Sequence, residues 1–175
     1  VLLKTYSGDT LFILTAVINA MILLPFIFLF SPSSFINDKF AKTKVIRICA
    51  VFGVVISVAV LISYLLGAFG VAFALTLILA AQSAIYSPAK YGIIKALVGT
   101  ERLGTANGVI QALTIVAILV SSFLFSFIFE NLYIQGENSE EILKSVYPIG
   151  IFLVVFSALE AFFAYKLPYI SETNE

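Results

Sequence analysis

Three polar side chains fall on one face of a helix predicted between residues 70 and 94. Gln82, Tyr86 and Lys90 are spaced i, i+4 and i+8, which places them along one helical stripe. A lysine ammonium attracts an anion as a point charge, and the attraction strengthens where water is scarce. The pattern indicates a face that could bind an anionic group. The alternative is that Lys90 extends its side chain to the lipid headgroups and contacts no substrate.

Pro88 and Gly92 flank this lysine. Proline removes a backbone donor and kinks a helix, which a membrane helix tolerates where it borders a cavity. Glycine lets another backbone, or a ligand, approach closely. We therefore expect Lys90 to lie at the irregular end of a cavity-lining helix.

A second polar stripe follows in the next predicted helix. Asn107, Gln111 and Thr114 are spaced i, i+4 and i+7. Polar groups in hydrocarbon are costly and usually face the interior of a bundle. We expect one substrate-binding cavity, lined by Lys90, Tyr86, Gln82, Asn107 and Gln111. The alternative is that the amides and hydroxyls only join helices by hydrogen bonds.

The composition requires a membrane around these helices. The 175 residues are 61% hydrophobic and 11% charged, with a mean hydropathy of +1.10, whereas globular domains are about 25% charged. About 20 apolar residues cross a bilayer. The sequence predicts an all-α membrane protein with five spans, at about 11–30, 45–66, 70–94, 105–129 and 146–167. The span 45–66 has few polar residues, so we expect it to be an outer, lipid-facing helix.

The same composition excludes several other classes. The formal net charge is zero, so no nucleic-acid partner is expected. The chain has no histidine, and Cys49 is its only cysteine, which excludes internal disulfides and His/Cys metal sites. No cofactor is expected. Glu160 lies within the last span, six residues before Lys166, where we expect a structural or interfacial role.

Basic residues predict the orientation. Lys39, Lys42, Lys44 and Arg47 follow the first span, and Lys95 follows the third. Cytoplasmic loops are enriched in such residues, so these connections and the C-terminus are expected in the cytoplasm. Five spans then begin outside, and one more helix before Val1 would make six. Six helices form half of a twelve-helix transporter.

Two segments resemble known motifs. "SFINDKFAKTK" (34–44) and "ERLGTANG" (101–108) are similar to conserved segments of the major facilitator superfamily. "YSPAKYGI" (86–93), followed by "LGTANGVIQALTIVAILVS" (103–121), resembles the bacterial lysophospholipid transporter family more closely. Gln111 stands where that family usually has glutamate. The resemblance implies that this chain supplies helices two to six of the N-terminal half of a major facilitator fold.

The resemblance also implies a function. Such carriers move lysophospholipid, mainly lysophosphatidylethanolamine, across the bacterial inner membrane for reacylation, and are not enzymes themselves. The implied partners are membrane lipids, the missing transporter half and, in some bacteria, a fused acyltransferase and acyl-ACP ligase. The alternatives are a facilitator of another amphiphile or drug, and a non-transporting membrane domain of a fused acyltransferase.

The loop motif suggests a conformational latch. Asp38, Lys39 and Lys42 match the motif, and Arg102 is expected on the same side of the membrane. We expect Asp38 to cap or pair with a neighbouring helix end, through Arg102. The alternative is that the basic residues only set the topology.

Overall fold

The computed structural model describes residues 9–132 and 139–170, and all regular structure in these ranges is helical. This confirms the all-α class. Four helices are long and apolar enough to cross a membrane, or five if one bent pair counts as a single span. The elements are α2 (Asp9–Phe28), α3 (Phe30–Lys39), α4 (Lys42–Leu65), α5 (Phe69–Val98), α6 (Leu103–Leu132), α7 (Ser139–Ser145) and α8 (Tyr147–Lys166).

The first predicted span continues further than expected. Instead of ending near residue 30, it bends by 42° and continues as α3 to Lys39. Pro32 lies in the first turn of α3, where a missing N–H costs nothing, and this favours a new helix start here. Most of the expected loop 34–44 is therefore helical, and only Phe40 and Ala41 separate α3 from α4.

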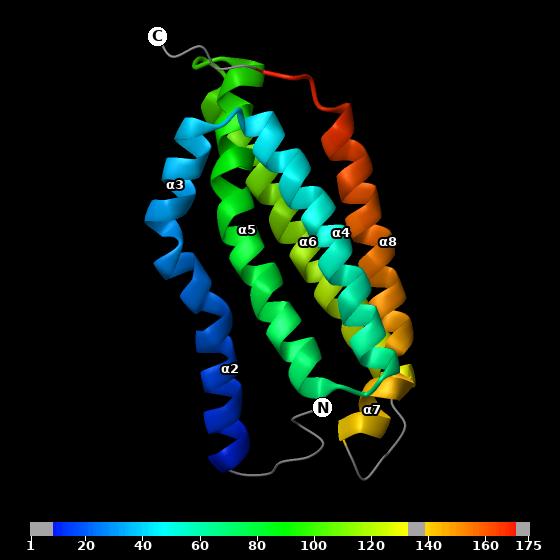
Figure 1. Ribbon diagram of the computed structural model, residues 1–175. Coiled ribbons are helices and arrows are strands. Elements are labelled where there is room, and N and C mark those ends of the chain that lie inside the picture. The colour runs from blue at the N-terminus through cyan, green and yellow to red at the C-terminus, as the bar shows by residue number, and fades with distance from the viewer. Residues whose placement is uncertain (1–8, 133–138, 171–175) are drawn as a thin grey trace.

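The long helices form an elongated bundle in which α4 lies between α5 and α8 (Figure 1). Within its span 44% of α4 is buried, the highest share of the four long helices. The prediction that this segment is an outer, lipid-facing helix is therefore wrong within this chain. The physical reason is that Ala50, Gly53 and Ser57, all buried, let neighbouring helices approach closely.

Two glycines make the turns that the helix ends require. Gly67 joins α4 to α5 with φ +70°, and Gly99 ends α5 with φ +74°. Both values lie in the left-handed region, which side chains disfavour. A Cβ on Gly67 would also overlap the Glu140 side chain of α7. The turn into α5 is thus packed directly under α7.

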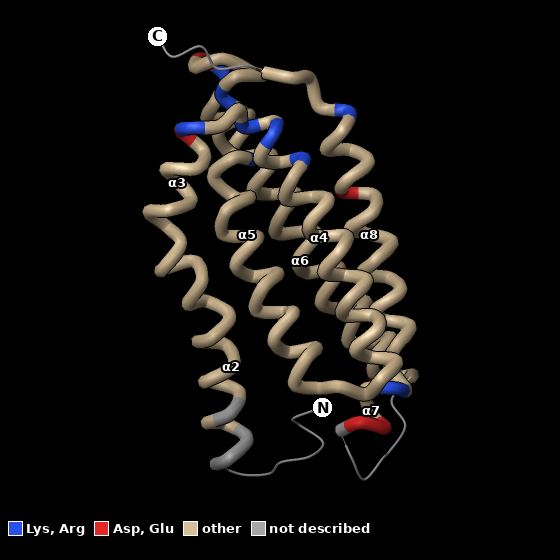
Figure 2. The backbone as a smooth tube through the Cα atoms, viewed as in Figure 1, with Lys and Arg blue, Asp and Glu red and all other residues tan. Residues whose placement is uncertain are grey.

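Charged residues are distributed unevenly along the bundle. Most lysines and arginines gather at the end that holds the α3–α4 and α5–α6 connections, here called the basic end (Figure 2). The acidic α7 lies at the opposite end, with Glu140 and Glu141 in its first turn. The asymmetry matches the one used to predict orientation. Which end faces the cytoplasm stays a prediction.

Candidate functional site

Pro88 lies inside α5, which continues through it without a break. Proline has no N–H, so the carbonyl of Ala84 lacks its usual helical donor. One residue further on, the Ile85 carbonyl accepts a hydrogen bond of 3.1 Å from the side-chain amide of Asn37 on α3. Asn37 is only 4% exposed. α3 is therefore joined to α5 five residues before Lys90, by a residue that the sequence analysis did not single out.

Lys90 faces α6. Its Nζ donates to the Thr114 hydroxyl at 3.5 Å, and the same Nζ lies 5.7 Å from the centroid of the Tyr91 ring. The Thr114 hydroxyl donates in turn to the Ile110 carbonyl at 2.8 Å, which fixes its orientation. The ammonium is half-buried and has one weak neutral acceptor in these contacts. Such a cation keeps capacity to bind an anionic group.

Two further polar residues of α6 were expected to line the site, Gln111 and Asn107. The Tyr91 hydroxyl donates to Oε1 of Gln111 at 2.9 Å. Oδ1 of Asn107 is buried and, within the described residues, accepts no hydrogen bond. Tyr91 was not singled out from the sequence because it lies off the stripe of Lys90. The α5–α6 contact thus combines the Lys90 ammonium, the hydroxyls of Thr114 and Tyr91, and the Gln111 amide.

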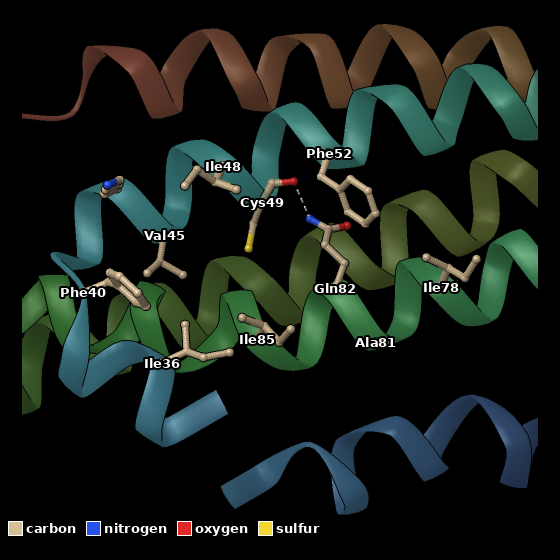
Figure 3. A pocket seen from close by; sticks show the side chains of 11 residues that line it. Ile36, Phe40, Val45, Ile48, Cys49, Phe52, Ile78, Ala81, Gln82 and Ile85 are labelled. Atoms are coloured by element: carbon tan, nitrogen blue, oxygen red, sulfur yellow. Dashed lines mark hydrogen bonds between the residues drawn. The ribbon is translucent and has the colours of Figure 1, made fainter. Parts of the chain in front are cut away.

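Gln82 points away from α6. Its Nε2 donates to the Cys49 carbonyl on α4 at 2.8 Å, and its amide lies against Gly53 (Figure 3). Gln82 also lines a pocket of about 460 Å³ between α3, α4 and α5. The rest of that pocket is almost entirely apolar.

Tyr86 is directed toward α4 and α8. It packs against the buried cluster that includes Cys49, Ala89 and Ala164. The Glu160 side chain of α8 lies close to it. Glu160, for which a structural or interfacial role was expected, is therefore a neighbour of a predicted site residue.

The predicted stripe on α5 is therefore divided between two sides of the helix. Each step of four residues turns the side-chain direction by about 40° around the helix axis. The side chains of Gln82 and Lys90 therefore point in directions that differ by about 80°. In a helix with neighbours on several sides, that rotation directs Gln82 to α4 and Lys90 to α6. The structure brings Lys90 to α6 beside the pair of Tyr91 and Gln111, and it places Gln82 and Tyr86 elsewhere.

The four latch residues lie near the basic end. Nζ of Lys39 lies 5.7 Å and 5.9 Å from the ring centroids of Phe35 and Phe40. Asp38 and Arg102 are both exposed, and among the described residues no ion pair joins them. The latch stays a prediction.

The Lys42 side chain lies directly over Gly92. A Cβ at position 92 would lie 2.5 Å and 2.7 Å from the Cε and Cδ atoms of Lys42. The close approach that was expected at this glycine therefore comes from the stem of a side chain of α4. This contact brings the first turn of α4 against the last two turns of α5.

Arg47 performs a structural role that the sequence did not reveal. Its guanidinium donates to the carbonyls of Ala164, Tyr165 and Leu167 at 3.3, 3.2 and 2.7 Å. These groups lie at the C-terminus of α8, where carbonyls lack helical donors and the helix dipole favours a cation. In the sequence, Arg47 is one of several basic residues after the first span, and that pattern indicates only the orientation of the chain in the membrane.

Thr43 holds the segment that follows α8. Its hydroxyl donates to the Pro168 carbonyl at 3.2 Å and accepts from the Ile170 N–H at 3.3 Å. Thr43 and Arg47 are one helical turn apart, so they act on neighbouring parts of the same segment. Together they form a clamp between the first turns of α4 and residues 164–170.

No group of three or more histidine, cysteine, aspartate or glutamate side chains comes together within the described ranges.

Comparison with known proteins gives similarity over part of the chain. No family model matches, and no solved structure matches. A protein named lysophospholipid transporter LplT from Serratia proteamaculans is 37% identical over 87 residues, which is 50% of this chain and 20% of that protein. A protein of the same name from Salmonella heidelberg is 34% identical over 93 residues, which is again 50% of this chain and 20% of that protein.

A third relative of the same name, from Photorhabdus laumondii, is 50% identical over 46 residues, or 26% of this chain and 12% of that protein. The matches thus cover no more than a fifth of the length of these relatives. Over up to half of its length, this multi-pass α-helical membrane chain is similar to proteins named lysophospholipid transporters.

Proposed function

We propose that this chain belongs to a transporter that moves lysophospholipid across the bacterial inner membrane. The observation that carries the proposal is Lys90, a half-buried cation inside a membrane helix whose contact across to α6 is a single hydroxyl at 3.5 Å. The names of the partial relatives support the same substrate class.

The α5–α6 contact suits a lipid with one anionic head. Lys90 offers the cation, while Gln111, Asn107 and Tyr91 offer a few hydrogen-bonding groups to the rest of a headgroup. Sugars would demand many more such groups. In the whole transporter, Lys90 binds the phosphate, and the apolar helix faces accommodate the acyl chain. Gln82 and Tyr86 support α5 from the α4 and α8 side.

The remainder of the proposal concerns the whole protein. The chain supplies helices two to six of the N-terminal half of a major facilitator fold, with the basic end and the C-terminus in the cytoplasm. A second half closes the cavity, and an acyltransferase, separate or fused, consumes the delivered lipid. Asp38, Lys39, Lys42 and Arg102 form the cytoplasmic latch between the two access states.

The test is uptake of labelled lysophosphatidylethanolamine into spheroplasts that produce the whole protein containing this chain. Lys90→Ala should abolish uptake, because the phosphate loses its cation. Lys90→Arg should retain a part, because charge matters more than shape at a point contact. Lys95→Ala is the matched control, since Lys95 is exposed in the last turn of the same helix.

Membrane levels of each variant must equal those of the parent. If Lys90→Ala transports at the parental rate, Lys90 only reaches for the headgroups and the site is wrong. If the parent takes up a labelled drug or another amphiphile but no lysophospholipid, the substrate class is wrong.

A further inference from the structure

The pocket between α3, α4 and α5 lies on the side of α5 that faces away from the Lys90 contact. Its walls include Ile36 of α3, Phe52 of α4 and Ile85 of α5 (Figure 3). The volume of about 460 Å³ lies within the usual range of ligand pockets, about 300–1,000 Å³. A pocket of this size is not explained by the proposed transport site, because neither Lys90 nor any residue of α6 lines it.

Its interior is suited to hydrocarbon. The polar side chain inside it is Gln82, and that amide nitrogen is already bonded to the Cys49 carbonyl at 2.8 Å. A polar ligand would leave its own groups without partners here, at a high cost in free energy. An acyl chain needs no partners, and burial of each methylene favours its binding.

One rim of the pocket is cationic. Lys44 lines it from the first turn of α4, and Phe40 lines it from the α3–α4 connection. Lys39 and Lys42 flank this connection, and the only acid in the same segment is Asp38. The rim lies at the basic end, where most lysines and arginines gather (Figure 2). Apolar walls below a cationic rim are complementary to an anionic lipid.

We propose that this pocket binds an anionic membrane phospholipid, with one acyl chain between α3, α4 and α5 and the headgroup phosphate at Lys44. The lipid is a resident of the bilayer and not the transported molecule. It packs the joint between α3 and α4, close to where Asn37 bonds to α5. This proposal does not rest on the transport function.

The test is native mass spectrometry of the whole protein in mild detergent, titrated with phosphatidylglycerol. Ala81→Trp fills the pocket and should weaken binding of the first lipid by about tenfold, because about two methylenes lose their burial. Ala74→Trp is the matched control, since Ala74 is exposed on the same helix and does not line the pocket.

Lys44→Ala should weaken phosphatidylglycerol binding by about fivefold, because one cation near the headgroup is lost. Lys95→Ala should leave it unchanged. Lys44 is exposed at a helix start, so this variant keeps the proposal testable even if Ala81→Trp fails to fold. Phosphatidylcholine should bind the parent more weakly than phosphatidylglycerol and should not respond to Lys44→Ala.

Three results would overturn the proposal. Equal binding by Ala81→Trp and Ala74→Trp would show that lipid only surrounds the protein. Preferential binding of lysophosphatidylglycerol, with the same dependence on Ala81 and Lys44, would make the pocket part of the transport site. If the protein binds a second copy of itself and Ala81→Trp abolishes that binding, the pocket is a contact between copies.

Discussion

The α4–α8 contact and the α5–α6 contact join helices of similar length and hydropathy, yet they are built differently. α4 and α8 touch through small residues and backbone, with Gly150 directly over Leu61, and the clamp of Arg47 and Thr43 closes one end. α6 buries no residue fully, and the side-chain hydrogen bonds that join it to α5 come from polar groups such as Lys90 and Gln111.

The difference between these contacts fits the proposed function, in which α4–α8 supports the bundle and α5–α6 binds the substrate. In lipid, helices associate by close packing because hydrocarbon is as apolar as the side chains, so a scaffold contact needs small residues. A contact held by a few polar side chains can open at lower cost and present those groups to a ligand. We therefore interpret α4–α8 as the scaffold and α5–α6 as the working contact.

The largest expected effect is at Gly150. A Cβ there would lie 3.0 Å from Cδ1 and 3.2 Å from Cα of Leu61, so Gly150→Leu must push α8 from α4. The free energy of unfolding in detergent should fall by about 2–3 kcal/mol. Gly108→Leu on α6, where nothing lies within 4 Å of a new Cβ, should change it little. Equal losses in the two variants would remove the distinction between the contacts.

Arg47→Ala should have the next largest effect. It removes three hydrogen bonds from a cation to the C-terminal carbonyls of α8, and the free energy of unfolding should fall by about 1–2 kcal/mol. Hydrogen exchange at residues 167–170 should rise as the clamp opens. Lys95→Ala, exposed in the last turn of α5, should change neither the free energy of unfolding nor the exchange. Unchanged exchange in Arg47→Ala would mean that Thr43 alone holds the segment.

The α5–α6 contact should respond more weakly to loss of its polar pairs. Tyr91→Phe removes an exposed hydrogen bond of 2.9 Å, and Thr114→Val removes one of 3.5 Å. Each should lower the free energy of unfolding by less than about 1 kcal/mol, measured as for Gly150→Leu. A loss above about 2 kcal/mol would make this contact part of the scaffold.

The smallest expected effect is at α7, beside the Gly67 turn. Lys144 donates to Glu140 at 2.6 Å, and this hydrogen bond lowers the pKa of the Glu140 carboxyl from its usual 4.5. A lowered folded-state pKa contributes stability above the unfolded pKa and loses it as pH falls through the folded value. Glu140→Gln should therefore reduce the melting temperature slightly at neutral pH. The gap to the parent should close in acid, and a gap that widens there would contradict the pairing.

The helices were largely predictable from the sequence because their cause is local. About 20 apolar residues cross a bilayer wherever they occur, and four of the long helices begin and end within a few residues of the predicted spans. The α2–α3 segment was less predictable. Residues 34–39 were expected to form part of a loop, whereas contacts such as the Asn37 bond to α5 support a helix.

The candidate site was predictable only in part. Spacing predicted one stripe of Asn107, Gln111 and Thr114 on α6, and Gln111 and Thr114 do bond to α5. Spacing could not show that Tyr91, off the stripe, bonds to Gln111. It also could not show which neighbour each side chain of α5 meets, because that depends on where α4, α6 and α8 lie.

By itself, the sequence determined that this is an all-α membrane protein, and it determined in which connections the basic residues lie. Hydropathy and charge act along the chain, so no partner is needed to read them. The tertiary structure decided that α4 is the central helix, that Arg47 and Thr43 clamp α8, and that Gln82 and Lys90 face different helices. These features depend on which helix surfaces pack together. Small residues and the rotation of each helix about its axis decide that packing, and a stripe of polar residues does not reveal either.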